Sequence, residues 1–317
     1  MKAVTNISCI GAGLIGQGWA TQFSAAGYET VLLDRDGAIL DKALRHIKAN
    51  LMFMERHQLI GKGHAARSLK MIRTTCNLAE AVANADYIQE AVFDTYAVKK
   101  PIFKEMDALA PRRAILASSS SGLLMTEIQT AVAVPERCLL AHPYLPVHLM
   151  PLVEVVGGRQ TSHAALASAC DLMQKIGKFP VLLRKEVPGY IVNRLQSALL
   201  REAIDLVDSG VASAEEVDNA FCLSLGLRGA FLGPLLRAHL AGDGIERFFE
   251  KFSESYRIRW KSMATWNSIS ARAADANIKS IYAMNILKGK SLQEIKTWRD
   301  EMLVRILKVI RQYARHG

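Results

Sequence analysis

A histidine and a glutamate stand where both are suited to proton transfer. His142 follows the apolar run 138–141 and precedes Pro143, so we expect it where a parallel strand ends and the chain turns out of the sheet. Glu154 interrupts a second apolar run, 152–156, where a carboxylate is costly unless it finds a partner. A carboxylate on one imidazole nitrogen fixes the tautomer and leaves the other nitrogen to accept a hydroxyl proton. On spacing alone, an ordinary hydrogen-bonded histidine and a solvent-facing glutamate remain the alternative.

A run of four serines, residues 118–121, follows the apolar run 114–117 and ends at Gly122. If 114–117 is a strand of the same sheet, these hydroxyls lie at the same edge as His142, where one of them is placed to hold a substrate oxygen. The alternative is an ordinary turn or helix cap, for which serine is also common.

Three glycines, Gly11, Gly13 and Gly16, lie between an expected strand and an expected helix, with Leu14 and Ile15 in the helix's first turn. Gly11 allows a tight turn, Gly13 lets the backbone approach a pyrophosphate, and Gly16 lets the helix pack closely on the strand. The helix N-terminus faces the anion. This pattern predicts a dinucleotide-binding turn.

The next expected strand ends in Asp34, and Arg35 follows it. A carboxylate at this position accepts hydrogen bonds from the ribose hydroxyls of NAD and repels the 2′-phosphate of NADP. Arg35 is able to pair with such a phosphate and so weakens the preference. The pattern favours NAD as the cofactor.

Short apolar runs alternate with helical patterns from Lys2 to about Val187, which predicts an α/β fold with a mostly parallel, Rossmann-type doubly wound sheet. A helical excursion is expected at residues 37–70, with Ile39, Ala43, Ile47 and Leu51 at helical spacing and a break at 61–63. Strands are expected at residues 7–10, 30–33, 87–90, 114–117, 138–141 and 152–156.

The dipeptide Pro188-Gly189 is the clearest punctuation in the second half, and helical periods follow it almost to Gly317. We therefore expect a dinucleotide-binding domain over residues 1–187 and an all-α domain over 188–317. Such a helical domain is suited to a role in substrate binding and dimerisation.

The chain has 317 residues, half of them hydrophobic, and a formal net charge of +10. Its five cysteines are scattered without the spacing of a metal site, and it has no apolar run as long as a membrane span. The N-terminus enters a strand pattern at residues 6–10 without the layout of a signal peptide, so we expect a cytoplasmic protein without a metal. The basic residues lie in helical patterns without interleaved aromatics, which favours an anionic small-molecule cofactor and substrate over a nucleic acid or a membrane. The alternative is that most of this charge is an ordinary solvated surface.

Over essentially its whole length the sequence resembles the 3-hydroxyacyl-CoA dehydrogenase superfamily. The resemblance rests on four motifs in the family's order: residues 11–16, residues 118–122, His142-Pro143 with Glu154, and residues 188–195. It implies an NAD-dependent dehydrogenase that works as a homodimer.

The resemblance also implies roles for single residues. His142 would be the acid/base, Glu154 its partner, and Ser121 and Asn193 the residues that position the substrate oxygen. The positions that contact NAD in the family are occupied here by Asp94 and Lys99.

The sequence departs from the family at Leu145, where the family usually has an asparagine that holds substrate or nicotinamide. Loss of one such hydrogen bond costs about 1 to 3 kcal/mol of transition-state binding, which slows a reaction without abolishing it.

Within the family, residues 226–234 and 298–301 are similar to the branch that contains L-gulonate 3-dehydrogenase (lambda-crystallin) and L-carnitine dehydrogenase. That branch implies a small free 3-hydroxy acid as the substrate. Arg228 is then a candidate to bind its carboxylate, with a helix-end salt bridge as the alternative. An aromatic cage would indicate carnitine, and the residues available for one are Tyr256, Trp260 and Trp266.

Two other functions stay open at this point. A 3-hydroxyacyl-CoA dehydrogenase would meet the CoA phosphates with basic residues near the helical excursion, namely Lys62, Arg67 and Lys70. A crystallin-like NAD-binding protein with little turnover is the alternative of another class, which Leu145 permits.

Overall fold

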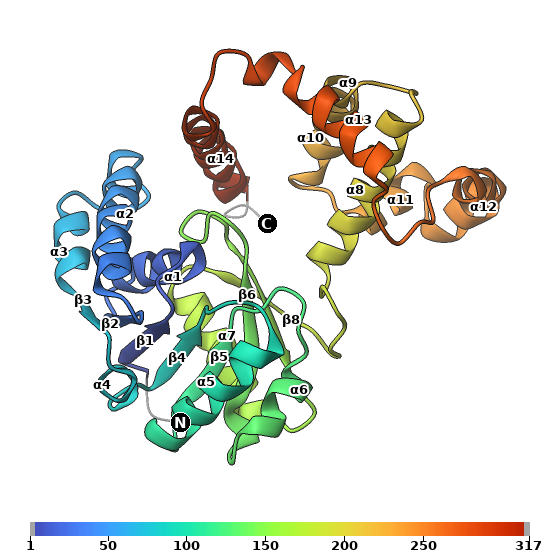
Figure 1. The fold of residues 1–317 in the computed structure, drawn as a ribbon. Coiled ribbons are helices and arrows are strands. Elements are labelled where there is room, and N and C mark those ends of the chain that lie inside the picture. The colour runs from blue at the N-terminus through green and yellow to red at the C-terminus, as the bar shows by residue number, and fades with distance from the viewer. Residues whose placement is uncertain (1–3, 314–317) are drawn as a thin grey trace. The chain divides into compact units, whose positions relative to one another are not determined.

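The computed structural model describes residues 4–313 of the chain and the side chains of residues 4–310. The chain divides into two compact units, Met1–Arg194 and Leu195–Gly317 (Figure 1). The predicted boundary at 187/188 falls shortly before this division, in the segment that leads from one unit to the other.

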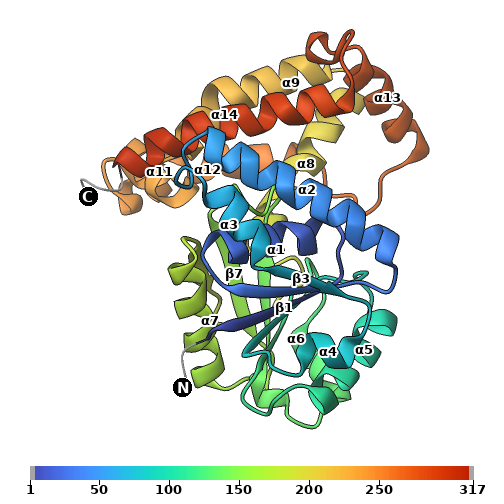
Figure 2. The ribbon, with the colours of Figure 1, turned by 90° about the vertical axis from the view of Figure 1, so that its left-hand side faces the viewer.

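The first unit is built on one eight-stranded sheet with the order β3-β2-β1-β4-β5-β6-β7-β8 (Figures 1 and 2). All neighbouring strands run parallel except β6 and β7, which pair antiparallel. This topology confirms the predicted Rossmann-type sheet. The strands are β1 (Asn6–Ile10), β2 (Glu29–Leu33), β3 (Ile72–Thr75), β4 (Tyr87–Glu90), β5 (Ile115–Ser118), β6 (Cys138–Pro143), β7 (Leu152–Gly157) and β8 (Phe179–Leu182).

Two strands and one strand end differ from the sequence prediction. Strands β3 and β8 were not expected, because both lie at sheet edges and carry polar residues or a proline in place of an apolar run. His142 does not follow the end of its strand. It lies inside β6, because pairing with β7 extends the ladder as far as Pro143.

Helices cover both faces of the sheet, and each face has its own apolar cluster. On one face lie α1 (Leu14–Ala25), α2 (Gly37–Arg56) and α7 (His163–Lys175). On the other lie α4 (Leu78–Val82), α5 (Tyr96–Leu109) and α6 (Met125–Ile128). The turns η1 (Gln129–Ala131) and η2 (Pro135–Arg137) lead into β6.

The helical excursion consists of two helices, α2 and α3 (His64–Lys70), separated at the predicted break. Gly63 has a φ of 72° there, a conformation that favours glycine. Ala43, Ile47 and Leu51 are buried as expected, whereas Ile39 is 39 % exposed and does not belong to the core. Leu40, the next residue, is buried in its place.

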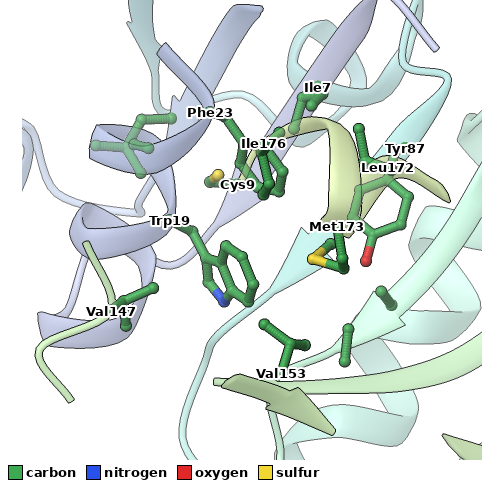
Figure 3. Packing of buried hydrophobic residues seen from close by; sticks show 14 of the residues in the cluster. Ile7, Cys9, Trp19, Phe23, Tyr87, Val147, Val153, Leu172, Met173 and Ile176 are labelled. Atoms are coloured by element: carbon green, nitrogen blue, oxygen red, sulfur yellow. The ribbon is translucent and has the colours of Figure 1, made fainter. Parts of the chain in front are cut away.

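Helix α1 is fixed on the sheet by two buried aromatic residues. Trp19 and Phe23 stack with ring centroids 5.2 Å apart, and Tyr87 of β4 meets Phe23 edge-on at 6.1 Å. Figure 3 shows these rings with Leu172 and Met173 of α7 beside them. This packing holds the start of α1, and therefore the glycine-rich turn, against the strand ends.

The second unit contains only helices among its described residues, which confirms the predicted helical domain. No single helix in the described chain is long and apolar enough to cross a membrane, although the bent pair 214–229 and 234–241 meets the criteria of length and composition together. The helices are α8 (Val192–Asp208), which begins in the first unit, then α9 (Ala214–Ala220), the π-helix η3 (Phe221–Gly226), α10 (Leu227–Gly229), α11 (Pro234–Ala241), α12 (Ile245–Ser262), α13 (Ala271–Tyr282), the turn η4 (Asn285–Leu287) and α14 (Leu292–Tyr313).

Candidate active site

His142 and Glu154 lie directly opposite each other in the antiparallel pair β6 and β7. The Nδ1 atom of His142 is 3.1 Å from Oε2 of Glu154, and the two side chains are 7 % and 1 % exposed. An ionised carboxylate only accepts hydrogen bonds, so Nδ1 carries the proton and donates it. Among the described side chains, the other nitrogen, Nε2, has no hydrogen-bond partner in the protein, and in this tautomer it is the acceptor.

Three further donors hold the Glu154 carboxylate. The hydroxyl of Tyr144 donates to Oε2 over 2.5 Å, and the backbone amides of Ile191 and Val192 donate to Oε1 over 2.9 and 3.0 Å. Burial alone would raise the pKa of Glu154, but the hydrogen bonds from His142, Tyr144 and the two amides outweigh it and lower the pKa. Glu154 is therefore ionised at neutral pH.

Two tyrosine rings enclose the imidazole of His142. Tyr144 meets it edge-on at a centroid distance of 4.7 Å, and Tyr190 lies tilted against it at 5.3 Å. Tyr190 is 1 % exposed and has a φ of 51°, and its hydroxyl donates to the carbonyl of Leu123. It follows Pro188-Gly189, so the predicted break between the domains also places a ring against His142.

The sequence reasoning missed both tyrosines. Tyr144 is two residues after His142, and residues two apart in an extended chain lie on the same face, so this signal was present. Tyr190 and the amides of Ile191 and Val192 come from a distant segment, and no local pattern announces their contact with this site.

The first three serines of the run 118–121 are engaged in hydrogen bonds within the protein and do not form an open row of hydroxyls. Ser118 donates to Glu90 over 2.6 Å, and the hydroxyl of Ser119 accepts from Trp19 and Gln89. The hydroxyl of Ser120 accepts from the amide of Leu123. These three serines shape the turn, and Ser121 is the exposed one.

Ser121, Asp94 and Asn193 form one cluster. The amide and hydroxyl of Ser121 donate to Oδ2 of Asp94 over 3.1 and 3.0 Å, and the side-chain amide of Asn193 donates to the carbonyl of Ser121 over 3.1 Å. Burial raises the pKa of Asp94, but bonds from Ser120 and Ser121 and the charge of Lys99 together lower it. The structure thus brings together three residues that were predicted from separate motifs.

Lys99 points into the protein. Its ammonium donates to both oxygens of Glu90 over 2.7 and 2.9 Å, and the two side chains are 1 % and 0 % exposed. Oδ1 of Asp94 lies 3.7 Å from the same ammonium. Lys99 therefore affects a bound cofactor indirectly, because it holds Asp94 and the end of β4 at Glu90 in place. Glu90 was expected only as the last residue of the strand 87–90, and its ion pair with Lys99 was not predicted.

The glycine-rich turn fits a dinucleotide diphosphate. A Cβ at Gly11 would lie 2.8 Å from the carbonyl of Ala91, and one at Gly16 would collide with the carbonyl of Gly11. At Gly13 a Cβ would meet nothing within 4 Å, so the approach to the first turn of α1, formed by Leu14 and Ile15, is open. No side chain caps this helix N-terminus. Its amides are placed to bind an anion.

Asp34 closes the other side of the turn. Its Oδ2 accepts from the amide of Ala12 and its Oδ1 from the amide of Arg35, both over 2.8 Å. An ionised carboxylate has about four acceptor positions, so further lone pairs remain for ribose hydroxyls. Asp34 is therefore suited to bind the ribose of NAD.

Leu145 and the basic residues considered for CoA phosphates lie in different parts of the first unit. Leu145 is 52 % exposed and forms a cis peptide bond with Pro146. Near the helical excursion, the basic residues Lys62 and Arg67 flank a turn whose amides, those of Gly63 and Ala65, donate to Glu55.

In the second unit, Arg228 lies on α10 and forms hydrogen bonds to Ser224 in the preceding turn, over 3.3 and 3.2 Å. It is exposed and makes no helix-end salt bridge among the described residues.

The residues considered for an aromatic cage do not form one group. Tyr256 and Trp260 pack along α12 with centroids 5.3 Å apart, and the Arg259 guanidinium lies 4.1 Å over the Tyr256 ring. The Trp266 indole instead donates to Asp205 of α8.

A Rossmann sheet with an open dinucleotide turn, and a histidine backed by a buried carboxylate at the ends of its strands, defines a pyridine-nucleotide oxidoreductase. The family comparison narrows this class. Residues 6–187 match the NAD-binding domain of 3-hydroxyacyl-CoA dehydrogenase, and residues 189–279 match its C-terminal domain. The chain belongs to the 3-hydroxyacyl-CoA dehydrogenase family, is an NAD-dependent enzyme acting on CH–OH groups, and uses NAD as its cofactor.

The chain is similar to two kinds of characterised relative over its full length. It is 33 % identical to lambda-crystallin of Oryctolagus cuniculus, with 98 % of each chain covered. It is 35 % identical to L-carnitine dehydrogenase of a Pseudomonas species, covering 100 % of this chain and 98 % of the relative. Among solved structures, 5-formyl-3-hydroxy-2-methylpyridine 4-carboxylic acid 5-dehydrogenase, an NAD+-dependent dismutase, has a TM-score of 0.84 at 26 % identity, covering 97 % of this chain and 99 % of that one.

Proposed function

We propose that the enzyme oxidises the 3-hydroxyl of a small free 3-hydroxy acid to the 3-oxo acid, with His142 as the acid/base and Glu154 as its partner. The observation that carries this proposal is the buried contact between Nδ1 of His142 and Glu154, with Tyr144 and two backbone amides on the same carboxylate. That arrangement leaves one imidazole nitrogen as an acceptor near the strand ends.

The glycine turn at residues 11–16 and Asp34 would hold NAD, which when bound would supply the acceptor for a hydride from the hydroxyl-bearing carbon. The protein must take the hydroxyl proton in the same step, because the carbonyl product has none at that oxygen. Nε2 of His142 takes this proton, and the ionised Glu154 stabilises the imidazolium that results. In the reverse direction the imidazolium returns the proton to the carbonyl oxygen.

Ser121 and Asn193 position the substrate oxygen in this proposal. The Ser121 hydroxyl donates to Asp94, and its oxygen keeps lone pairs that accept a hydrogen bond from the substrate hydroxyl. The Asn193 amide holds the carbonyl of Ser121, which fixes the serine turn relative to the start of α8. The Lys99 ammonium lies 3.7 Å from Asp94 and so supports the carboxylate that holds Ser121.

The free-acid substrate class, L-gulonate-like or carnitine-like, is supported by the full-length similarity to lambda-crystallin and to L-carnitine dehydrogenases. Arg228 is the candidate for the substrate carboxylate, since a planar guanidinium binds a carboxylate in a bidentate manner.

The test is NADH formation by the purified protein on L-gulonate, L-carnitine, 3-hydroxybutyrate and 3-hydroxybutyryl-CoA at mildly alkaline pH. Turnover of a free acid without the thioester supports the proposal. Turnover of the thioester alone would transfer the chain to the acyl-CoA enzymes, with Lys62, Arg67 and Lys70 as the next residues to replace. NAD binding without turnover of any of the four would overturn the substrate class.

We further propose that the protein is a homodimer through its helical unit. Support comes from an apolar hollow of about 380 Å³ on that unit, lined by residues of α8, α9 and α13 such as Leu200, Ile204, Val207, Ile278 and Ile281. Sedimentation at the mass of one chain would contradict this proposal.

A further inference from the structure

Tyr144 and His142 bind the same carboxylate oxygen. Oε2 of Glu154 accepts the Tyr144 hydroxyl over 2.5 Å and faces Nδ1 of His142 over 3.1 Å. The other oxygen, Oε1, is occupied by the amides of Ile191 and Val192. Tyr144 therefore competes with the imidazole for the one oxygen that supports it.

We propose that Tyr144 is a positioning residue that weakens the hold of Glu154 on the His142 proton, and so sets the pH at which His142 becomes a base. The proposal rests on the acid/base role of His142 proposed above. Tyr144 is not assumed to touch the substrate.

The physical basis is the division of one negative charge among several donors. A short, charge-assisted hydrogen bond from a phenol withdraws electron density from Oε2, and the remaining attraction for an imidazolium is smaller. Burial and the neighbouring Glu154 both raise the pKa of Tyr144, so the phenol stays protonated and remains a donor over the working pH range.

The groups that face His142 come from three elements. Glu154 belongs to β7, Tyr144 follows β6, and Tyr190 lies before α8. Burial raises the pKa of Tyr190, which keeps it neutral, and its hydroxyl donates to Leu123 instead of to Glu154. Glu154 is thus the charged group in contact with the imidazole, and Tyr144 is the neutral donor that shares it.

The direction of the effect follows from this geometry. In Tyr144→Phe the ring remains against His142, but Oε2 is left to the imidazole alone, so the imidazolium is better stabilised. We expect the midpoint of the His142 titration to rise by about one pH unit, the size of change that loss of one charge-assisted hydrogen bond to the partner produces. Glu154→Gln removes the charge and must move the midpoint in the opposite direction.

Tyr190→Phe is the matched control. It removes the same atom from the other tyrosine ring that packs on His142, yet it takes no donor from Glu154. The midpoint should stay within about 0.2 pH units of that of the unmodified protein.

The first measurement is an NMR titration of the histidine ring protons in the full-length protein, with the His142 signal assigned by its absence in His142→Gln. The titration needs no substrate, so it reports on Tyr144 even if the proposed substrate class fails. Circular dichroism confirms that each variant is folded. A midpoint in Tyr144→Phe that is unchanged, or lowered, would overturn the proposal.

The second measurement follows the pH dependence of kcat/KM in both directions with whichever substrate turns over. Oxidation needs the neutral imidazole, so its acid limb should move to higher pH in Tyr144→Phe. Reduction needs the imidazolium, so its alkaline limb should move to higher pH as well. A merely structural role for Tyr144 would lower both rates without moving either limb, and that result would also reject the proposal.

Discussion

The sheet holds two buried carboxylates, Glu90 and Glu154, that accept four hydrogen bonds each but have different partners. Glu90, at the end of β4, accepts two bonds from the Lys99 ammonium and one each from Ser118 and the amide of Val92. Glu154, in β7, accepts from a histidine, a tyrosine and two amides. Their side chains are 0 % and 1 % exposed.

The difference lies in the charge of the partner. The partner of Glu90 is an ammonium group, so this pair is an internal salt bridge that fixes two strand ends. The imidazole of His142 is a group that takes up and releases protons, so the Glu154 pair changes charge when a proton arrives. Burial and hydrogen bonding alone therefore do not identify an acid/base group. The partner's ability to exchange a proton does.

The largest expected effect is the loss of turnover in His142→Gln. Glutamine keeps an amide donor for Glu154 but cannot take a proton, so kcat should fall by about 10² to 10⁴. NADH affinity, measured by fluorescence titration, should stay the same because the dinucleotide turn is untouched.

His163→Gln is the control for that variant, since His163 is exposed at the start of α7. It should keep turnover within about twofold. If His142→Gln bound NADH normally and turned over substrate at the wild-type rate, His142 would not be the acid/base, and the Glu154 pair would not differ in function from the Glu90 pair.

The next largest effect is on stability, in Lys99→Met. Removing the ammonium leaves the Glu90 charge buried without a counter-ion, which costs about 3 to 5 kcal/mol in the free energy of unfolding measured in urea. Lys100→Met is matched to it, because Lys100 is the next residue and its 3.8 Å pair with Glu127 is partly exposed. That variant should lose no more than about 1 kcal/mol. Equal losses in the two variants would mean that Lys99 is not a structural cation.

The sequence was sufficient to predict the sheet and the glycine-rich turn that surround the site. The strand runs and the glycine turn predict the sheet, and the interruption of an apolar run by Glu154 correctly indicates a buried carboxylate in need of a partner. It did not reveal that β6 and β7 pair antiparallel, which is what places His142 and Glu154 directly opposite each other. Register across a hairpin depends on tertiary pairing, which local apolar patterns leave undetermined.

The remaining misses share a physical cause. Tyr190 reaches His142 through the φ of 51° after Pro188-Gly189, and the amides of Ile191 and Val192 reach Glu154 from the same segment. These contacts join residues far apart in the chain, so no spacing rule predicts them. The sequence also does not show that the Lys99 side chain points into the protein, because that direction depends on its ion pair with the buried Glu90.

The smallest expected effect tests whether Glu154 also has a structural role. Its pKa is lowered in the folded protein, so its ionised form contributes stability at pH values above the unfolded pKa of about 4.3. This contribution is lost as the pH falls through the folded pKa. Glutamine keeps an acceptor for the two amides and an isosteric shape, so Glu154→Gln should lose about 1 to 2 kcal/mol at pH 7. That loss should shrink toward zero when urea unfolding is repeated below about pH 4. A loss as large as that of Lys99→Met, and independent of pH, would mean that Glu154 is a structural carboxylate like Glu90, and the distinction drawn from their partners would fail.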